Sequence, residues 1–578
     1  MDKEYQKLVL GCQNCKQNFV IEPDDFLFYE KIKVPPPTWC PECRMIRRLI
    51  WRNERSLYKK ESDFTGKSIF SGYSPDSLFK IYEDRIWNSD EWDPKEMGRE
   101  YDFSRPFIEQ FMELHKSVPR PAIAVIDMVN SDYCNNATEG KNCYLLFSFA
   151  YCEDCMYGSR FSYCKDSLDS LFINKSEFVY ESFQIDGSSH VFYSSLCKDS
   201  INVYFSKNLK NCQNCFGCVN LNNKNYCIFN EQYTKDEYSK KINEFAIGSY
   251  SSVQEIKKQI KEFWLKFPNK FMSGISNYEV SGEYINNSKN VKKSYNVNGG
   301  EDIKYSQFLY VPSSRDIYDT TLYGDNSENI YESVHVGLNI SNFLFCTDSW
   351  TSLSNISYCV YCTSSSDLFG CVGIRKGQYM ILNRQYTKSE YEELVPKIIR
   401  HMSDMPYIDS KGRIYKYGEF FPSELSPFAY NETIAQEYYP LTKEQAIQQG
   451  YKWKDKEERN YTIDIHTEDI PDSITDIEDQ DILNKVIECS HKGTCNQQCT
   501  EAFKIIPEEL SFYRRMNLPL PHLCPNCRHY ERLAQRNPMK LWHRSCMKEG
   551  CTNTFETSYS PERPEIVYCE RCYQNEVY

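Results

Sequence analysis

The sequence predicts a multidomain, mainly β protein: two narrow β-solenoids with 12–14-residue rungs and helical caps, flanked by small treble-clef and zinc-ribbon modules. Three observations lead to this prediction. Paired cysteines stand near both ends of the chain, the middle has a 12–14-residue period, and aromatic residues make up 15% of the composition. A chain of 578 residues is too long for one core, so about three to five domains are expected.

Charge and cysteine content narrow the class of protein. The net charge of -13 disfavours non-specific binding of nucleic acid by the whole surface. The first residues, MDKEYQKLVLGC, contain no apolar signal-peptide core, and no apolar run reaches membrane-spanning length. We therefore expect a cytoplasmic protein without a membrane partner. In that compartment the 27 cysteines are expected to be metal ligands or buried thiols rather than disulfides.

The first zinc module is predicted from two cysteine pairs near the start of the chain. Cys12 and Cys15 form one pair, and Cys40 and Cys43 form another that begins 25 residues after Cys15. A tetrahedral zinc ion takes four thiolates from two tight turns of this kind. Apolar and basic residues at helical spacing follow the second pair, over 44–60. A ligand pair that opens a helix is typical of a treble clef.

A second module of the same kind is expected near the C-terminus. Cys495 and Cys499 precede Cys524 and Cys527, and the interval from Cys499 to Cys524 is again 25 residues. The first pair contains one residue more than its N-terminal counterpart. For this reason the ligand set stays open at one position, where Cys489 or His491 could replace Cys495.

A zinc ribbon is predicted directly after the second treble clef. Its expected ligands are Cys546, Cys551, Cys569 and Cys572. The N-terminal segment 59–95 resembles this ribbon, because SGYSPDSLFKIYEDRI matches the order of TSYSPERPEIVYCERC. In the N-terminal copy Glu83 and Ile86 take the places of the last two cysteines, so we expect a metal-free ribbon held by packing, with Trp87 and Trp92 as candidates.

All three sites are expected to hold structural zinc, giving three ions per chain. Four protein thiolates complete the coordination sphere and leave no position for a substrate. Such a site contributes about 10–16 kcal/mol of apparent folding free energy, which small modules cannot obtain from their own cores.

A 12-residue period predicts the first solenoid. Four columns recur at this interval over eight turns. They are Cys143, Cys155, Ser167, Val179, Val191, Val203, Cys215 and Cys227; Tyr144, Met156, Leu168, Tyr180, Phe192, Tyr204, Phe216 and Ile228; Ala137, Phe149, Phe161, Ile173, Ile185, Cys197, Leu209 and Leu221; and the small residues Gly158, Ser170, Ser182, Ser194, Ser206 and Cys218. One such period is too short for a helical hairpin but suffices for one coil with inward stacks, and all these columns are expected to point inward.

A second array follows at the looser period. Its apolar column is Val291, Ile303, Ile317, Ile330, Phe343, Ile356, Leu368 and Met380, and its small column is Ser294, Ser306, Thr320, Ser333, Cys346, Cys359 and Cys371. Both arrays end in the motif QYTKxEY followed by helix-like sequence, which we interpret as caps. Stacked cysteines within the arrays are interpreted as small apolar core residues rather than as metal ligands.

The predicted domains follow from these features. The chain is expected to divide into a treble-clef module (1–58), a metal-free ribbon (59–95), a helical connector (96–130), a β-solenoid (131–232), a helical cap (233–283), a β-solenoid (284–385), a helical or irregular cap (386–452), an acidic linker (453–488), a treble-clef module (489–545) and a zinc ribbon (546–578). The linker carries eight acidic residues and no Lys or Arg between Asp464 and Asp481, so a solvated tether is expected.

Several motifs carry a resemblance that spans nearly the whole chain. They are PPPTWCPECRMIRRLIWRNERSLYKK, WDPKEMGREYDFSRPF, SDYCNNATEGKNCYL, the two QYTKxEY endings, LPLPHLCPNCRHYERLAQRNP and RPEIVYCERCY. With them the chain resembles a family of uncharacterised zinc-ribbon and treble-clef proteins from small-genome candidate-phyla bacteria. The resemblance implies zinc binding and no established activity. This chain departs from the pattern at Ser62, where that family typically has a cysteine.

For function, the sequence favours a non-enzymatic binding scaffold for a protein or polymer partner. It contains no phosphate-binding Gly-rich loop, nucleophile elbow or HExxH motif. An enzyme with a site on a solenoid face stays open. The other alternative is nucleic-acid binding by basic stripes at helical spacing after each treble clef: Arg44, Arg48, Arg52, Arg55 and Lys59, then Arg528, Arg532 and Arg536. The stripes could equally dock on acidic surfaces of the same chain.

Overall fold

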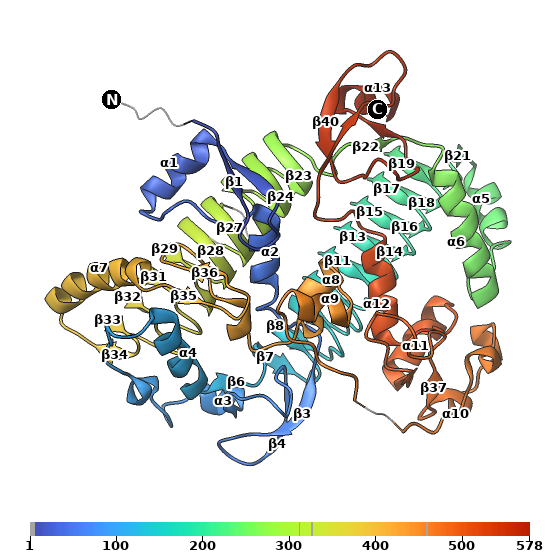
Figure 1. Ribbon diagram of the computed structural model, residues 1–578. Helices are drawn as coiled ribbons and strands as arrows, with labels where there is room; N and C mark the ends of the chain where they lie inside the picture. Colours follow the sequence, from blue (N-terminus) through green and yellow to red (C-terminus); the bar gives the residue numbers. More distant parts are fainter. Residues whose placement is uncertain (1–5, 311–312, 325–326, 458–459, 578) are drawn as a thin grey trace.

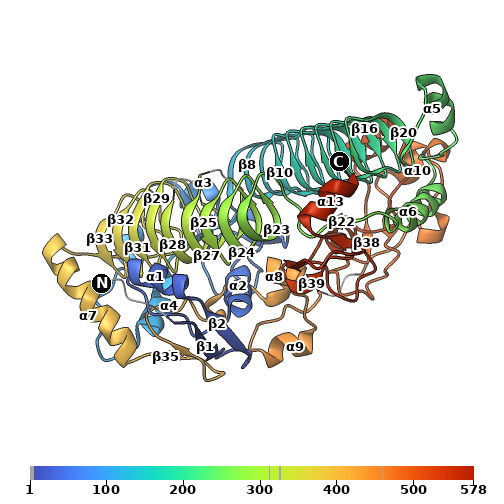
Figure 2. The same cartoon turned by 90° about the horizontal axis from the view of Figure 1, so that it is seen from above.

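Two coiled β arrays form the centre of the molecule (Figures 1 and 2). The computed structural model describes residues 6–310, 313–324, 327–457 and 460–577. Both arrays begin near the middle of the molecule and end at its outer edges, and the small modules at the chain ends lie against them (Figure 2). The mainly β architecture with solenoids predicted from the repeats is confirmed.

The first array coils through parallel strands. They are β7 (Val125–Val129), β8 (Asn135–Lys141), β9 (Phe147–Glu153), β10 (Ser159–Ser162), β11 (Leu171–Asn174), β12 (Glu177–Tyr180), β13 (Phe183–Asp186), β14 (Ser189–Phe192), β15 (Ser195–Lys198), β16 (Ile201–Tyr204), β17 (Lys207–Lys210), β18 (Gln213–Phe216), β19 (Val219–Asn222), β20 (Asn225–Ile228) and the antiparallel end strand β21 (Glu231–Gln232). The register advances by one repeat period per rung, so that Val179 lies beside Val191 and Ile173 beside Ile185.

A left-handed backbone residue at every third position gives the coil its shape. Asp154, Tyr157, Arg160 and Tyr163 have φ between 53° and 62°, and this spacing continues along the array. Each rung is therefore four short sides joined at left-handed corners. Most of these corners carry side chains other than glycine, and such a conformation costs about 1–3 kcal/mol per residue. Backbone hydrogen bonds to the rungs above and below hold the corners in place.

The interior of the first array contains three of the four predicted columns. The columns that begin at Cys143 and Ala137 and the small column of Ser170 and its equivalents are buried inside the coil. The prediction is wrong for the column from Tyr144 to Ile228, whose buried members form a separate cluster on the outside of the coil. Neighbouring residues of a strand point to opposite faces, so two adjacent columns cannot both face inward.

Serine hydroxyls explain the small column. The Ser182 hydroxyl donates to the Tyr180 carbonyl at 2.8 Å and accepts the backbone N–H of Ser194, one rung later, at 3.0 Å. The same bond joins Ser206 N–H to the hydroxyl of Ser194. These hydroxyls supply acceptors for N–H groups that no neighbouring strand pairs at the corners. A small side chain with an acceptor atom is therefore favoured at these positions, although the column begins with Leu146 and Gly158.

The second array has longer strands, which continue through several corners, but the same three-residue spacing of left-handed residues. Its strands are β23 (Tyr278–Asn286), β24 (Lys289–Asn298), β25 (Glu301–Lys304), β26 (Gln307–Leu309), β27 (Arg315–Tyr323), β28 (Glu328–Val336), β29 (Ile340–Leu344), β30 (Thr347–Ser349), β31 (Leu353–Ser357), β32 (Ser366–Phe369), β33 (Gln378–Ile381) and β34 (Arg384–Gln385). The predicted apolar column from Val291 to Met380 is buried, and Cys346 Sγ accepts the N–H of Cys359 at 3.3 Å. Cysteine thus takes the place of serine in the ladder.

Both arrays end in the same way, as the shared motif predicts. The last strands, β21 and β34, reverse direction and pair antiparallel with the strand before them. Thr234 and Thr387 then cap the N-termini of α5 (Lys235–Ile242) and α7 (Lys388–Asp404), and Glu237 and Glu390 complete the two capping boxes. The reversal ends the parallel ladder, so the coil does not continue into another copy in the same direction.

The acidic segment is not the solvated tether that the sequence predicts. Ile470, Ile474, Ile477 and Ile482 are buried in the cluster that covers the first array. The segment forms η4 (Thr467–Asp469), η5 (Ile474–Asp476) and α10 (Asp479–Ile482), and it lies against α6 (Tyr250–Trp264), where Tyr250 N–H donates to Asp472 at 2.8 Å. Isoleucines alternate with acidic residues in this segment, so the isoleucine side chains are buried while most of the carboxylates face solvent. Charge alone did not reveal this pattern.

The remaining elements belong to the end modules and connections. In the first part of the chain they are β1 (Leu8–Gly11), β2 (Asn18–Ile21), α1 (Pro23–Lys31), α2 (Pro41–Leu49), β3 (Tyr58–Glu61), β4 (Ser68–Ser71), β5 (Ile81–Tyr82), α3 (Asp84–Trp87), η1 (Pro94–Met97), α4 (Phe107–Ser117), β6 (Arg120–Pro121) and β22 (Asn269–Lys270). After the arrays they are β35 (Tyr407–Ile408), β36 (Ile414–Tyr415), η2 (Ser423–Leu425), η3 (Tyr430–Glu432), α8 (Ile434–Tyr438), α9 (Lys443–Gln448), β37 (Ile487–Glu488), β38 (Ala502–Phe503), α11 (Pro507–Met516), α12 (Pro525–Ala534), β39 (Trp542–Ser545), β40 (Thr554–Thr557), β41 (Val567–Tyr568) and α13 (Glu570–Val577).

Both arrays begin a few residues earlier than predicted. The first coil starts at β7 within the expected helical connector 96–130, and the second starts at β23 within the expected cap 233–283. The 12-residue register already holds in the first turn of the first array, where Val125 lies beside Ala137, whereas Val280 lies beside Val291 at an interval of 11 residues in the second.

A substitution in the serine ladder tests this account of the interior. Replacing Ser182 with Ala leaves the Ser194 N–H without its acceptor inside the coil, so we expect the free energy of unfolding to fall by about 1–3 kcal/mol. Ser182→Cys should cost less, because thiols already take this place in both arrays. Urea unfolding of the two variants measures the difference. Equal losses for Ala and Cys would show that the hydroxyl is not the reason for the small column.

Candidate metal centres and their clamps

The first four-cysteine cluster lies between a hairpin and a helix. Cys12 follows β1 and Cys40 is the N-cap of α2, where its side chain accepts the N–H of Cys43. The Cys40 N–H donates to Cys12 Sγ at 3.2 Å, and Cys15 Sγ lies 3.8 Å from Cys40 Sγ. Four Zn–S bonds of about 2.3 Å at tetrahedral angles place the sulfurs about 3.8 Å apart. The predicted ligands are therefore brought together at the spacing of a tetrahedral metal site.

The second cluster differs from the predicted set at one position. Cys489, Cys499, Cys524 and Cys527 lie within reach of one ion, so Cys489 takes the place expected for Cys495. Cys489 follows β37 as Cys12 follows β1, and its sulfur accepts the Cys524 N–H at 3.2 Å. The hairpin geometry decides the ligand: the sulfur at the end of the first strand is held at the site, whereas Cys495 belongs to the loop beyond it.

The third cluster consists of Cys546, Cys551, Cys569 and Cys572, as the sequence predicts. It repeats the pattern of the other two, because the Cys569 N–H donates to Cys546 Sγ at 3.3 Å. Cys551 Sγ and Cys569 Sγ are 3.9 Å apart, again close to the edge of a ZnS4 tetrahedron.

All three clusters fit a closed metal site. In each, a backbone N–H donates to the first sulfur, which favours the thiolate that a metal requires. Four thiolates are the ligand set of structural zinc, and they leave no coordination position for a reactant. Each cluster could therefore hold an ion whose role is to fix a hairpin against the start of a helix.

The segment predicted to be a metal-free ribbon forms a hairpin and has a carboxylate among its polar side chains. Its hairpin, β3 with β4, matches β39 with β40, but the hydroxyls of Ser62 and Thr65 donate to the Glu83 carboxylate where the other modules bring sulfurs together. Trp87 is buried and its indole N–H donates to the Pro119 carbonyl at 3.1 Å. Hydrogen bonds and aromatic packing thus replace the ion.

The basic stripes do not face solvent. Arg44, Arg48, Arg52, Arg528, Arg532 and Arg536 are all buried, each no more than 7% exposed. The contact with nucleic acid that the stripes suggested is therefore corrected to an internal contact for these six residues. Arg55 is half-buried and donates to the Ser159 hydroxyl at 3.2 Å, and only Lys59 is exposed.

The first stripe meets a carboxylate at a corner of the second array. Asp319 has φ of 52° and is fully buried on β27. One of its oxygens lies 2.8 Å from Arg44 Nη2 and the other 3.0 Å from Arg48 Nη1. Arg48 also donates to the Tyr305 carbonyl at 3.1 Å. Arg47, also on α2, was not singled out in the sequence analysis. Its guanidinium group forms ion pairs with the carboxylates of Glu332 and Glu419.

The second stripe makes the same contacts with the first array. Asp169, a corner residue with φ of 47°, accepts from Arg528 and, at 3.0 Å, from Arg532. Arg532 donates to the Tyr157 carbonyl at 3.0 Å, as Arg48 does to Tyr305. We call these two arrangements the arginine clamps: Arg44, Arg48 and Asp319 in one, and Arg528, Arg532 and Asp169 in the other.

A tyrosine and a further acid complete each clamp. Arg44 lies over the Tyr305 ring and Arg528 over the Tyr157 ring, at 5.3 and 4.6 Å from the ring centres. The Tyr157 hydroxyl donates to Glu509 at 2.7 Å, and the Tyr305 hydroxyl donates to Asp25 at 3.2 Å. Burial raises the pKa of Glu509, and the Arg528 guanidinium opposes that shift.

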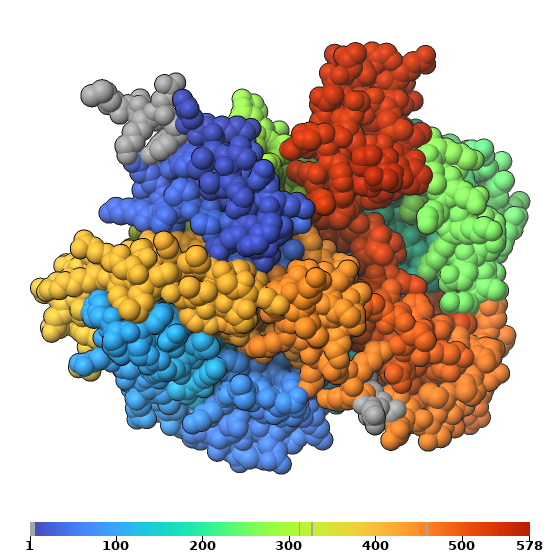
Figure 3. Space-filling model, in the orientation of Figure 1, coloured from blue at the N-terminus to red at the C-terminus, as the bar shows by residue number. Residues whose placement is uncertain are grey.

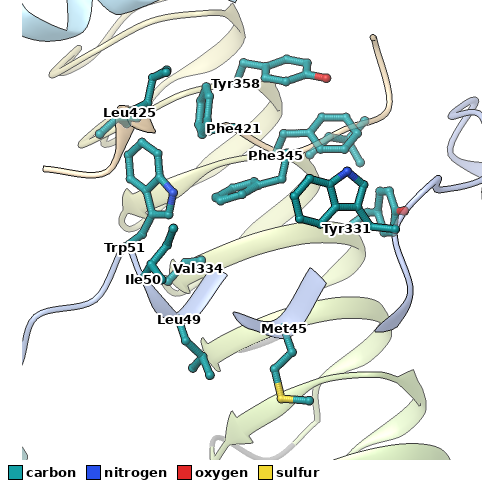
Figure 4. Packing of buried hydrophobic residues seen from close by; sticks show 14 of the residues in the cluster. Met45, Leu49, Ile50, Trp51, Tyr331, Val334, Phe345, Tyr358, Phe421 and Leu425 are labelled. Atoms are coloured by element: carbon teal, nitrogen blue, oxygen red, sulfur yellow. The ribbon is translucent and has the colours of Figure 1, made fainter. Parts of the chain in front are cut away.

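Apolar packing surrounds the first clamp. Met45, Leu49, Ile50 and Trp51 on and after α2 lie against Tyr331, Val334 and Phe345 of the second array, with Phe421 and Leu425 closing the other side (Figure 4). The segment around α8 and α9 fills the space between the N-terminal and C-terminal modules on this face (Figure 3). The guanidinium groups therefore lie within a dry interface, where losing a partner is costly.

The ribbons pair with the starts of the arrays. In the metal-free ribbon β5 pairs in parallel with β6, just before the first array. In the zinc ribbon β41 pairs in parallel with β22, just before the second. Figure 1 shows the consequence: β4 and β40 lie at opposite edges of the molecule, and α2 and α12 lie on opposite sides of its centre. Each half of the molecule thus has an array, a hairpin module at its start and, on its side, a helix that begins at a cysteine cluster.

The cysteines inside the arrays do not take part in these sites. Among the residues that the structure describes, the groups that could hold a metal contain none of the cysteines between Cys134 and Cys371. The thiol of Cys197 instead donates to the Ser195 carbonyl, as the serines of the ladder do. This agrees with the interpretation of these residues as small core side chains.

Comparisons with protein-family models, with curated proteins and with solved structures find no match for this chain. The resemblance to the bacterial zinc-ribbon family remains an expectation. Within the described ranges, the chain forms no helix with the length and apolar character needed to cross a bilayer.

Sequence reasoning left the choice of Cys489 open and missed the two clamp aspartates. Cys489 could have been chosen over Cys495, because Val486 and Ile487 precede it as Val9 and Leu10 precede Cys12. No comparable signal marks Asp169 and Asp319, since both stand among many polar residues of the arrays.

Metal analysis of two cysteine variants tests the corrected ligand set. After dialysis against a mild chelator we expect three tightly bound zinc ions in the wild type and two in Cys489→Ser. That variant should also lose much of the roughly 10–16 kcal/mol that such a site contributes, and with it the docking of α12. Cys495→Ser should keep three tightly bound ions and the thermal stability of the wild type. Loss of a tightly bound ion in Cys495→Ser, but not in Cys489→Ser, would restore the set first predicted.

Neutralising the clamp carboxylates tests their role in stability. Asp319→Asn removes the nearest carboxylate from two buried arginines and leaves them only Glu332, at 3.7 Å from Arg44 and 3.6 Å from Arg48, so the free energy of unfolding should fall by about 3–5 kcal/mol. Asp316→Asn is a matched control on the same strand, because its partner Lys31 is half-exposed at 2.9 Å and such pairs contribute about 0–1 kcal/mol. Denaturant unfolding measures both, and equal effects would argue against the clamp.

Proposed function

We propose that this protein is a binding scaffold stabilised by structural zinc, whose exposed solenoid faces bind a partner protein or polymer. The observation that supports the proposal most directly is the burial of the treble-clef helices on the arrays. The basic helices of the end modules therefore contact the arrays rather than a partner. The regular surfaces that remain exposed to solvent are those of the two arrays.

The exposed side of the first array is a polar ladder with a fixed rise. Lys141, Glu153 and Lys165 lie one above another in successive rungs, and the Glu153 carboxylate is within 2.6 and 3.3 Å of the two ammonium groups. On the neighbouring ridge Tyr151 and Tyr163 are 43% and 55% exposed, with stacked rings 4.6 Å apart. Large flat aromatic groups held at little further entropic cost are favourable contact residues in interfaces.

The second array presents a similar ladder. The side-chain amide of Asn329 donates to Asn342 at 3.1 Å, Asn342 to Asn355 at 2.9 Å, and Asn355 to Asp367 at 3.1 Å. Asn342 and Asn355 are exposed, Asn329 and Asp367 are half-buried, and all four are fixed at the repeat of the strands. A partner with its own regular spacing, such as an extended chain or a polymer, matches such a surface over several rungs at once.

The clamps weigh against nucleic-acid binding as the main function. A phosphate backbone could reach Arg44, Arg48 or Arg528 only if the helices left the arrays, which would break the buried ion pairs. The triple change of Arg44, Arg48 and Arg52 to Glu is therefore expected to unfold or loosen the N-terminal module. A folded triple variant that has lost measurable binding of RNA or DNA would favour the nucleic-acid alternative instead.

Cross-linking in cells tests the scaffold proposal. An amine-reactive cross-linker should join exposed lysines of the arrays, such as Lys175 and Lys289, to a recurrent partner, and Tyr151→Ser combined with Tyr163→Ser should reduce these links at least about tenfold, the effect of about 1.4 kcal/mol. Leu78→Ser combined with Tyr461→Ser is the control, since both side chains are exposed outside the arrays. Partner links confined to lysines outside the arrays, such as Lys397 of α7, would contradict the proposal.

A further inference from the structure

The second treble clef contains a loop that the other modules lack. Nine residues separate Cys489 from Cys499, whereas two separate Cys12 from Cys15 and four separate Cys546 from Cys551. The strands on either side are equivalent: Ile487 pairs with Phe503 as Leu10 pairs with Phe19. The additional residues are therefore an insertion between the first two ligands of the closed site.

The inserted loop brings two further ligands to the closed cluster. His491, Cys495 and Cys527 have ligand atoms that all lie within 4.8 Å of one another. Cys495 Sγ is 3.7 Å from Cys527 Sγ, which matches the 3.9 Å between Cys489 Sγ and Cys527 Sγ inside the closed cluster. A spacing of about 3.8 Å is that of two sulfurs bound to the same zinc ion.

Comparison with the first module shows that this approach is specific. Cys43 is the counterpart of Cys527, and its sulfur accepts a hydrogen bond from the Asn14 side chain at 3.3 Å. In the second module the sulfur of Cys527 is met on one side by the thiol of Cys495. Asn14 can only donate a hydrogen bond to its cysteine, whereas Cys495 at the equivalent place can bind a metal ion.

The imidazole of His491 provides a second, independent observation. Its Nδ1 atom is buried and has no hydrogen-bond partner among the described residues. A buried polar atom without a partner is costly, and coordination to a metal would satisfy it. The loop around it is held in place, since Thr494 donates to the His491 carbonyl at 2.7 Å and Ser490 N–H donates to His522 at 2.9 Å.

We propose that His491, Cys495 and Cys527 bind a second zinc ion, and that the Cys527 thiolate bridges it to the ion in the closed site. Two Zn–S bonds of about 2.3 Å keep the ions within about 4.6 Å of each other. Four thiolates around one divalent ion carry surplus negative charge. The second ion adds two positive charges for one more thiolate, so the surplus falls and the pair of ions is electrostatically favoured.

Three protein ligands make this site open, unlike the closed sites. The fourth position of a tetrahedral ion goes to an exchangeable ligand such as water, hydroxide or a free thiol. His491 and Cys495 are both half-buried rather than enclosed, so a small ligand can reach the ion from solvent. The chemistry assigned to the site is therefore reversible binding of a small anionic or thiol ligand to zinc.

Counting zinc ions in the intact protein tests the proposal. With free zinc buffered in the micromolar range, native mass spectrometry should find four ions in the wild type and three in Cys495→Ser and in His491→Asn. His543→Asn is the control, because this exposed histidine lies outside the proposed site and should leave four ions bound. Three ions in the wild type, or four in both site variants, would overturn the proposal.

Cobalt substitution tests the bridge separately from the count. Two cobalt(II) ions joined by one thiolate couple magnetically, so the magnetic moment per cobalt should be lower in the fully loaded wild type than in Cys495→Ser. X-ray absorption of the zinc form should show a metal–metal vector within about 4.6 Å that Cys495→Ser removes. Equal moments and no such vector, with four ions bound, would place the fourth ion elsewhere and refute the bridged site.

Discussion

Two buried aspartates, each shared by a pair of arginines, are the contacts on which the arrangement of this molecule depends. Asp319 and Asp169 stand at left-handed corners of the arrays and accept from arginines four residues apart on a helix. Arginines four residues apart lie on the same face of a helix, so each can reach one of the two oxygens of a single carboxylate. These charges are removed from water, so burying the arginines without the aspartate, or the aspartate without the arginines, would be costly. Each array therefore determines where α2 or α12 must lie.

Two of the cysteine clusters lie at the N-termini of the two helices that carry the clamp arginines. Cys40 and Cys524 are the N-caps of α2 and α12, and the arginines of the clamps follow within one or two turns. An ion that joins the hairpin to the cap sets the direction of the helix axis and so the positions of the guanidinium groups. With a metal ion bound, helix orientation and docking would form one cooperative event with metal binding, which is the usual coupling of a structural metal to folding.

The arrays can supply such corners because their backbone repeats an otherwise unfavourable conformation. A left-handed residue at every third position would be unstable in an isolated rung, yet each rung binds its neighbours through backbone bonds and through the hydroxyls of residues such as Ser182 and Ser194. Corner side chains point outward at fixed intervals, so Asp169 and Asp319 are presented to a docking helix with Tyr157 and Tyr305 at the equivalent corners one rung earlier. The same regularity makes the exposed faces repetitive.

The sequence by itself determined the elements whose cause is local or periodic. The 12-residue period predicted the coils, the cysteine pairs predicted the clusters at Cys12 and Cys546, and the QYTKxEY motif predicted the array ends, because each depends on neighbours along the chain or one rung away. Only the tertiary structure decided where charged and apolar surfaces go. It turned the Tyr144 column outward beneath α6, buried the acidic segment on its isoleucines, chose Cys489 over Cys495, and directed Arg44 and Arg528 to carboxylates about 275 and 359 residues away along the chain. A basic stripe reads the same in sequence whether its partner is a phosphate or an aspartate, since burial and pairing are properties of the folded neighbourhood and not of the stripe.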